Sequence, residues 1–195
     1  MREIGDRIKS VEADLAAVLA DLNETLLPLP NTPLADVPGG LNEESNEIIH
    51  TSDGPTESHG NAHWDVAPAL GILDLEAGAD ISGARFFVMN GKGAKLQRAL
   101  AAWMLDVHTN EHGYTEIDPP LLVRSETMQG SGNLPKFREN LYHDDETDLW
   151  LVPTAEVALN ALHQGKIIDP DVLPLKYVAE TPSFRKEHAA GGRDV

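Results

Sequence analysis

Apolar residues recur at intervals of four and three along the first part of the chain. They are Ile4, Ile8, Val11, Leu15, Val18 and Leu22, with polar residues between them. This heptad spacing predicts a helix with one apolar seam, which ends near Leu26-Leu27-Pro28. A helix with so short a seam is not stable alone, so a partner helix is expected. An ordinary amphipathic surface helix has the same periodicity and remains the alternative.

The next segment loses this periodicity and is rich in proline and glycine. Residues 29–40 contain three prolines and two glycines, which predicts an extended connector rather than a helix. Residues 46–50 are predicted to form a short strand, and residues 51–61 a polar surface loop. Asp65 is a candidate N-cap for an amphipathic helix over residues 66–76.

Helical and strand patterns alternate through the middle of the chain. Residues 83–91 predict a strand that ends in an Asn-Gly turn. Residues 96–111 predict a helix that ends at Gly113 and buries the apolar positions Leu96, Leu100, Trp103, Met104 and Val107. A strand is expected over residues 114–123, and another over residues 149–152.

The strand over residues 149–152 leads into a stretch with candidate chemistry. Pro153 interrupts the strand, and Thr154 can cap the helix that follows. Glu156 then lies in the first helical turn, close to exposed backbone N–H groups. A carboxylate at this position has a plain explanation, since it complements the helix dipole.

The last stretch carries the second candidate site. Leu175, Tyr177 and Val178 predict a strand, and Pro182 interrupts it. Alternation places Arg185 and Glu187 on one face and Lys186 on the other. An arginine fixed on a strand can hold a phosphate through two hydrogen bonds. An exposed hairpin with an ordinary Arg–Glu pair is the plain alternative.

Composition narrows the class of protein. The chain has 195 residues, 41% of them hydrophobic, and no apolar run of membrane-spanning length. It has no cysteine, so disulfides and thiolate sites are excluded, and the expected location is the cytoplasm. The net charge of −17 argues against non-specific binding to a phosphate backbone, so DNA is not an expected partner. A membrane is not expected either, because no apolar run is long enough to span one. The pair His59/His63 has no carboxylate pattern nearby, and the pair His108/His112 shows no third ligand. No metal bound by protein side chains is therefore expected.

Several motifs together resemble one known family. Phe184-Arg185-Lys186-Glu187, followed by small residues and Gly192-Arg193-Asp194, is similar to motif 2 of class II aminoacyl-tRNA synthetases, although His188-Ala189 stands where the family has Ala-Gly. The helix and strand over residues 96–123 resemble motif 1. Gly130-Ser-Gly-Asn-Leu-Pro-Lys-Phe137 and Thr154-Ala155-Glu156 resemble two further segments of seryl-tRNA synthetases.

This resemblance implies a fold and a division of the chain. The fold would be mixed α/β (α+β), with a class II antiparallel sheet core and helices, preceded by half of a coiled-coil arm. Residues 1–27 would be the second helix of a tRNA-binding arm and residues 28–60 a linker with a short strand. Residues 61–195 would be a partial catalytic core, and the chain is expected to be truncated at both ends.

The resemblance also implies a reaction. The family activates serine with ATP and Mg²⁺ and transfers it to tRNA(Ser), as a homodimer. Thr154, Ala155 and Glu156 would receive serine, Arg185 would be the catalytic residue, and Arg185, Lys186 and Glu187 would bind ATP. Because the third family motif is missing, the chain alone is expected to be inactive. The alternative is a non-catalytic synthetase-like protein that dimerises or binds ligands.

Overall fold

The chain folds into helices joined by short strands and long connecting segments. The structure is a computed structural model that describes residues 2–54 and 60–186. Its helices are α1 (Arg2–Leu26), α2 (His63–Ala69), α3 (Leu75–Ser82), α4 (Gly91–Asn110), α5 (Ser125–Gly130) and α6 (Ala155–Ala161), with 3₁₀ turns η1 (Glu43–Ser45), η2 (Arg138–Asn140) and η3 (Pro170–Val172). Its strands are β1 (Leu73–Asp74), β2 (Val88–Met89), β3 (Thr115–Glu116), β4 (Leu122–Val123), β5 (Trp150–Leu151) and β6 (Tyr177–Val178).

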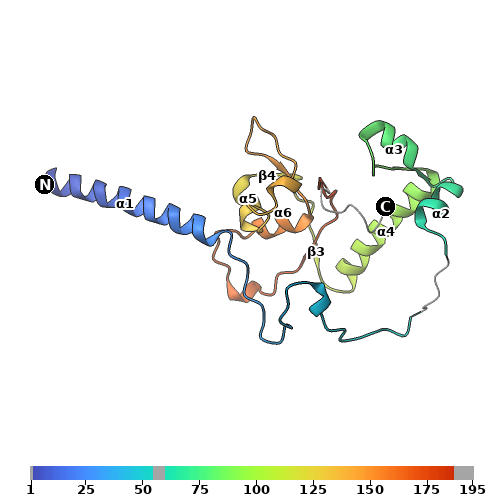
Figure 1. The fold of residues 1–195 in the computed structure, drawn as a ribbon, viewed down its shortest axis with the longest axis horizontal. Helices are drawn as coiled ribbons and strands as arrows, with labels where there is room; N and C mark the ends of the chain where they lie inside the picture. The colour runs from blue at the N-terminus through green and yellow to red at the C-terminus, as the bar shows by residue number, and fades with distance from the viewer. Residues whose placement is uncertain (1, 55–59, 187–195) are drawn as a thin grey trace.

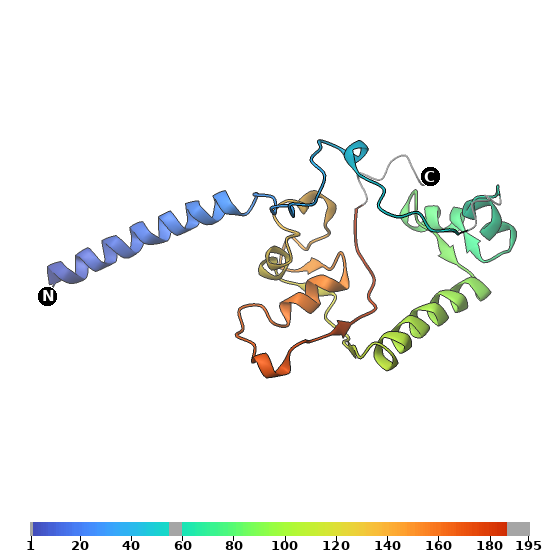
Figure 2. The same ribbon diagram turned by 90° about the horizontal axis from the view of Figure 1, so that it is seen from below.

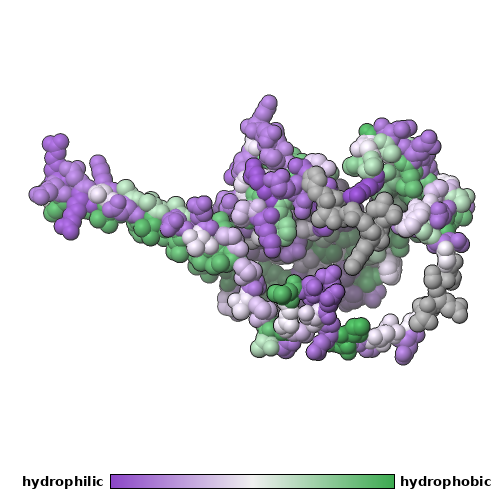
Figure 3. All heavy atoms as spheres, viewed as in Figure 1, coloured by the Kyte–Doolittle hydropathy of each residue, from purple (hydrophilic) through white to green (hydrophobic). Residues whose placement is uncertain are grey.

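Helix α1 projects from the rest of the molecule as a single rod (Figures 1 and 2). Its boundaries agree with the prediction from the heptad spacing. The six seam residues are 49–63% exposed, and apolar side chains form a band along the rod in Figure 3. The seam therefore has no cover within the described part of the chain, and the coiled-coil arm stays a prediction.

A long connector leads from α1 to α2, and the strand predicted within it is not observed. Residues 46–50 form no strand, and Ile48 and Ile49 are almost fully exposed. A strand requires a neighbour that accepts and donates its backbone hydrogen bonds. No described strand lies against these residues.

The predicted helix over residues 66–76 is also wrong. Helix α2 already begins at His63 and ends at Ala69, after which Gly71 adopts a φ of 68° that breaks the helical path. The chain then forms β1, which pairs antiparallel with β2. Asp65 is not an N-cap, because α2 has Ala62 as its N-cap and Asp65 lies in its first turn. The next helix, α3, is capped by Asp74, whose carboxylate accepts the Ala77 N–H at 2.9 Å.

Helix α4 begins five residues earlier than predicted. Asn90 is its N-cap, so the Asn90-Gly91 pair opens a helix and does not form a hairpin turn, and the strand before it is only Val88–Met89. Gly93 packs closely against the preceding segment, because a Cβ there would lie 2.4 Å from the Ile72 carbonyl oxygen.

The apolar face of α4 is exposed, contrary to the prediction of a buried face. Trp103 is 60% exposed, Leu96, Leu100 and Met104 are also exposed, and Val107 is half-buried. The described residues provide too few neighbouring side chains to cover this face. We refer to these five residues as the α4 face.

The hydrophobic core lies in a central module built by β4, β5, α5 and α6 (Figure 1). Strands β4 and β5 pair antiparallel, with Val123 opposite Trp150, and α5 packs against α6. The core consists of Val123, Met128, Leu134, Leu141, Trp150, Val152, Val157 and Ala158.

The remaining strand pair joins this module to the end of α4. Strands β3 and β6 run parallel, with Thr115 opposite Tyr177 and Glu116 opposite Val178. The mixed α/β class is thus confirmed. The described strands form three two-stranded sheets, two antiparallel and one parallel.

Candidate active site

The three predicted serine-binding residues lie where β5 passes into α6. Val152 and Pro153 are buried, and they anchor the chain immediately before Thr154. Thr154 is the N-cap of α6 with extended backbone, as predicted, but its side chain makes no capping hydrogen bond. Its hydroxyl is consequently not used by the helix and remains available for a ligand.

The other two residues form the first turn of the helix. Ala155 is half-buried and adds little bulk next to Thr154. Glu156 is exposed, and its Oε1 accepts only a long hydrogen bond of 3.4 Å from Asn160 Nδ2. The carboxylate is therefore accessible for a cationic group and weakly held by its neighbours.

The predicted phosphate-binding residue lies beside the same loop. The Phe184 N–H donates to the Val152 carbonyl oxygen at 3.0 Å. The Arg185 Nε–H donates to the Pro153 carbonyl oxygen at 3.0 Å. The segment around Arg185 is thus joined to Pro153, which lies 32 residues earlier and directly before Thr154. The terminal NH₂ groups of Arg185 have no partner among the described residues.

Lys186 is held on another element. Its N–H donates to the Asn140 carbonyl oxygen at 2.9 Å, and its ammonium lies over the Tyr142 ring at 5.6 Å from the centroid. Lys186 therefore contacts the last residue of η2 and Tyr142 just after it, whereas Arg185 contacts the β5–α6 loop. Glu187, the third predicted ATP-binding residue, lies outside the described residues.

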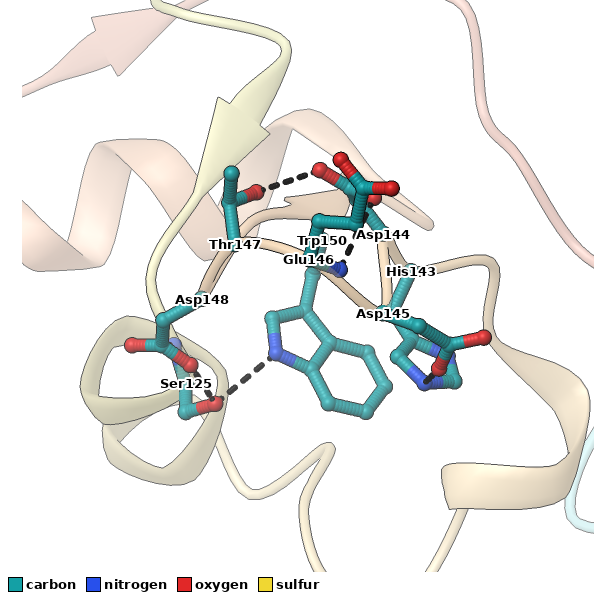
Figure 4. A network of polar contacts seen from close by, with 8 residues as sticks. All are labelled: Ser125, His143, Asp144, Asp145, Glu146, Thr147, Asp148 and Trp150. Atoms are coloured by element: carbon teal, nitrogen blue, oxygen red, sulfur yellow. Dashed lines mark hydrogen bonds and ion pairs between the residues drawn. The ribbon is translucent and has the colours of Figure 1, made fainter.

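Sequence reasoning missed a polar network beside this site (Figure 4). The acidic loop over residues 143–148 precedes β5. The Ser125 hydroxyl donates to the Asp148 carboxylate and accepts the Trp150 Nε1–H at 2.8 Å. His143 stacks on the Trp150 ring, with centroids 4.5 Å apart. A run of acidic residues in the sequence carried no signal for this network, because Ser125 lies 23 positions away.

Two carboxyl groups of this loop have altered acidity. The Thr147 hydroxyl donates to Asp144 and, with the Glu146 N–H, lowers the pKa of that carboxyl below its ordinary value. The Ser125 hydroxyl does the same for Asp148 and lowers the pKa of its carboxyl. In both cases the hydrogen bonds favour the charged form.

Other candidate groups do not join the site. The His108 and His112 Nδ1 atoms are 3.1 Å apart, and no group of three or more His, Asp or Glu suited to a metal ion occurs in residues 2–54 and 60–186. A cleft of about 180 Å³ between α5 and α6 is lined by Thr127, Ser131 and His163, among others, and by none of the predicted serine- or ATP-binding residues. No helix in the described residues is long and apolar enough to span a membrane.

The chain has close relatives among proteins of known function. It is 51% identical to the serine--tRNA ligase of Thermomicrobium roseum over 197 aligned positions, which cover 100% of this chain and 44% of that protein. It is 48% identical to the serine--tRNA ligase of Herpetosiphon aurantiacus, with 100% of this chain and 47% of that protein covered. No family model matches the chain.

Solved structures agree with the sequence relatives. The crystal structure of seryl-tRNA synthetase from Pyrococcus horikoshii complexed with ATP superposes with a TM-score of 0.84 at 30% identity, covering 100% of this chain and 48% of that chain. The cytoplasmic serine--tRNA ligase from Naegleria fowleri in complex with AMP gives a TM-score of 0.81 at 28% identity, covering 96% and 45%. The chain therefore belongs to the seryl-tRNA synthetase family, and it spans about half the length of the curated relatives that it matches.

Proposed function

We propose that the chain takes part in ATP-dependent activation of serine and its transfer to tRNA(Ser). In the first step a serine carboxylate oxygen attacks the α-phosphorus of ATP, the bond to the β-phosphate oxygen breaks, and pyrophosphate leaves. In the second step a ribose hydroxyl of the tRNA attacks the seryl carbonyl carbon, and AMP leaves. The relatives named as serine--tRNA ligases support this reaction class.

The observation that carries this proposal is the bond between Arg185 and the Pro153 carbonyl. It holds a guanidinium beside the loop that begins with Thr154. The reaction requires a cationic group at the α-phosphate and an anionic group at the substrate ammonium, and these must lie within one substrate length of each other. Arg185 and Glu156 supply the two charges.

Each predicted residue then has a role. Glu156 and the Thr154 hydroxyl receive the serine ammonium, and Ala155 leaves space for it. Arg185 binds the α-phosphate and the serine carboxylate as negative charge develops between them. Lys186 and Glu187 contribute to the nucleotide site. Mg²⁺ enters with ATP as part of the substrate complex, bound to its phosphates. The relatives complexed with ATP and with AMP support nucleotide binding.

The exposed surfaces fit the remaining partners. We propose that the α4 face pairs with a second copy of the chain in a two-fold dimer, because an apolar surface of this kind on a helix favours association. Helix α1, with Arg2, Arg7 and Lys9 beside its seam, would contribute to an arm that binds tRNA. Reaction with tRNA would take place in the cytoplasm.

Binding of serine by Glu156→Gln tests the proposed role of that residue. The change preserves shape and removes the charge, so loss of a charge-assisted hydrogen bond should weaken serine binding by about 1.5–3 kcal/mol, or roughly ten- to more than a hundredfold. Calorimetric titration of the chain with serine measures this change. Glu126→Gln is the matched control, because Glu126 lies in the first turn of α5 and is likewise exposed.

The outcomes separate recognition from helix stability. If Glu156 only complements the helix dipole, both variants should lose at most about 1 kcal/mol of stability and keep the same serine affinity. That result would refute the assignment. Serine-dependent ATP–pyrophosphate exchange is the second measurement. Because the chain alone is expected to be inactive, exchange at the rate of a complete synthetase would contradict that expectation.

A further inference from the structure

We propose that Asp148, Ser125 and Trp150 form a hydrogen-bonded clamp that positions the loop before Thr154 and, through it, Arg185. These are positioning residues, since they lie one step behind the candidate site. The consequence for serine binding rests on the proposed function, whereas the effect on the backbone does not.

The clamp depends on one hydroxyl that acts in two directions (Figure 4). Ser125 donates its Oγ–H to Asp148 and accepts the Trp150 Nε1–H at 2.8 Å. The Ser125 backbone N–H also donates to Asp148, at 3.2 Å. Because Trp150 is only 3% exposed, its indole N–H has no ready access to water as a substitute acceptor.

The indole ring is held on its faces as well as at its edge. His143 stacks on it with an interplanar angle of 19°, and the Arg138 guanidinium lies 5.0 Å from its centroid. Trp150 therefore connects the start of α5, the acidic loop and η2. A side chain held by three elements fixes the backbone of the strand that carries it.

That strand leads directly to the candidate site. Two residues after Trp150, the Val152 N–H donates to the Leu121 carbonyl at 2.9 Å, and the Val152 carbonyl accepts the Phe184 N–H at 3.0 Å. The next carbonyl, that of Pro153, accepts Arg185 Nε–H. A shift of Trp150 would thus displace both Thr154 and Arg185.

The same loop contains a natural control. Like Asp148, Asp144 is exposed and its carboxylate accepts a hydrogen bond from a hydroxyl group. Its donors are the Thr147 Oγ1–H at 2.6 Å and the Glu146 N–H at 3.2 Å, and both lie inside the loop. Removal of Asp144 therefore loosens the loop and leaves the link to α5 intact. Removal of Asp148 breaks that link.

Amide hydrogen exchange of the 195-residue chain, followed by NMR, tests the clamp. In Ser125→Ala and Asp148→Ala, exchange at the Val152 and Phe184 amides and at the Trp150 indole N–H should become at least about two- to tenfold faster. Loss of one hydrogen bond accounts for a factor of this size, and each variant loses two. Ser125→Thr keeps the hydroxyl and should restore slow exchange. Asp144→Ala should leave these sites unchanged, and amides within α4 serve as an internal reference.

Equal rates of amide exchange at Val152 and Phe184 in the unmodified chain and in both Ala variants would overturn the clamp. Acceleration that extends equally to α4 would also overturn it, because that indicates general destabilisation. Failure of the unmodified chain to bind serine would count against the proposed function instead. In that case the exchange measurements still decide whether the clamp exists.

Discussion

The central core gives a direct test of how burial determines stability in this chain. Met128 is 0% exposed and belongs to the eight-residue core, whereas Met104 is 52% exposed on the α4 face. The substitutions Met128→Ala and Met104→Ala delete identical atoms. Any difference between them therefore comes from the surroundings of the side chain.

The expected magnitudes are well separated. A fully buried Met replaced by Ala costs about 2–5 kcal/mol, since it loses transfer free energy and leaves a cavity. Because Met104 is half exposed, its loss should cost at most about 1 kcal/mol in the monomer. A typical domain is stable by only about 5–15 kcal/mol, so Met128→Ala removes a large part of the total.

Urea unfolding followed by the fluorescence of Trp150 measures both effects. The background should carry Trp64→Phe and Trp103→Phe, so that the signal comes from the core alone. The midpoint should fall strongly for Met128→Ala and little for Met104→Ala, with the same dependence on urea concentration. Equal shifts for the two variants would refute the view that the central module, and not α4, holds the core.

Two further predictions concern association and pH. Trp103→Asp places a charge in the α4 face, so light scattering should show that it converts a dimer to a monomer. Ala102→Asp, on another side of the helix, should leave the dimer intact. A native chain that stays monomeric at high concentration would contradict this prediction. The pKa values of Asp144 and Asp148 are lowered in the folded chain, so their contribution to loop stability is fully present above the ordinary value of about 4 and is lost as the pH falls through the lowered values. NMR titration of both carboxyls checks this, and titration at or above the ordinary value would oppose it.

Local patterns predicted some elements well. The boundaries of α1 follow from heptad spacing and a proline, and the position of Thr154 at the start of α6 follows from Pro153. In each case the determining residues are neighbours in sequence. The motif around Arg185 was also recognisable as a motif, although its contact with Pro153 was not.

The wrong predictions have a common physical cause. The predicted helix after Asp65 is interrupted by the turn at Gly71 and by the β1–β2 pairing, and a separate helix begins after Asp74. Residues 46–50 have strand propensity, but a strand forms only with a neighbour. The apolar positions of α4 predict that another protein surface covers them, but they do not identify that surface. Contacts between residues far apart in sequence determine where each helix or strand forms and which face is buried. A local sequence pattern carries no information on those contacts.

Under the proposed function, the bond between Arg185 and the Pro153 carbonyl has a consequence for the affinities for serine and ATP. If serine orders the loop that begins at Thr154, it also orders the carbonyl that holds the arginine. The two ligand affinities are then thermodynamically linked, and linkage is reciprocal: the factor by which serine changes the affinity for ATP equals the factor by which ATP changes the affinity for serine. One hydrogen bond of 3.0 Å would thus make the two halves of the site cooperative.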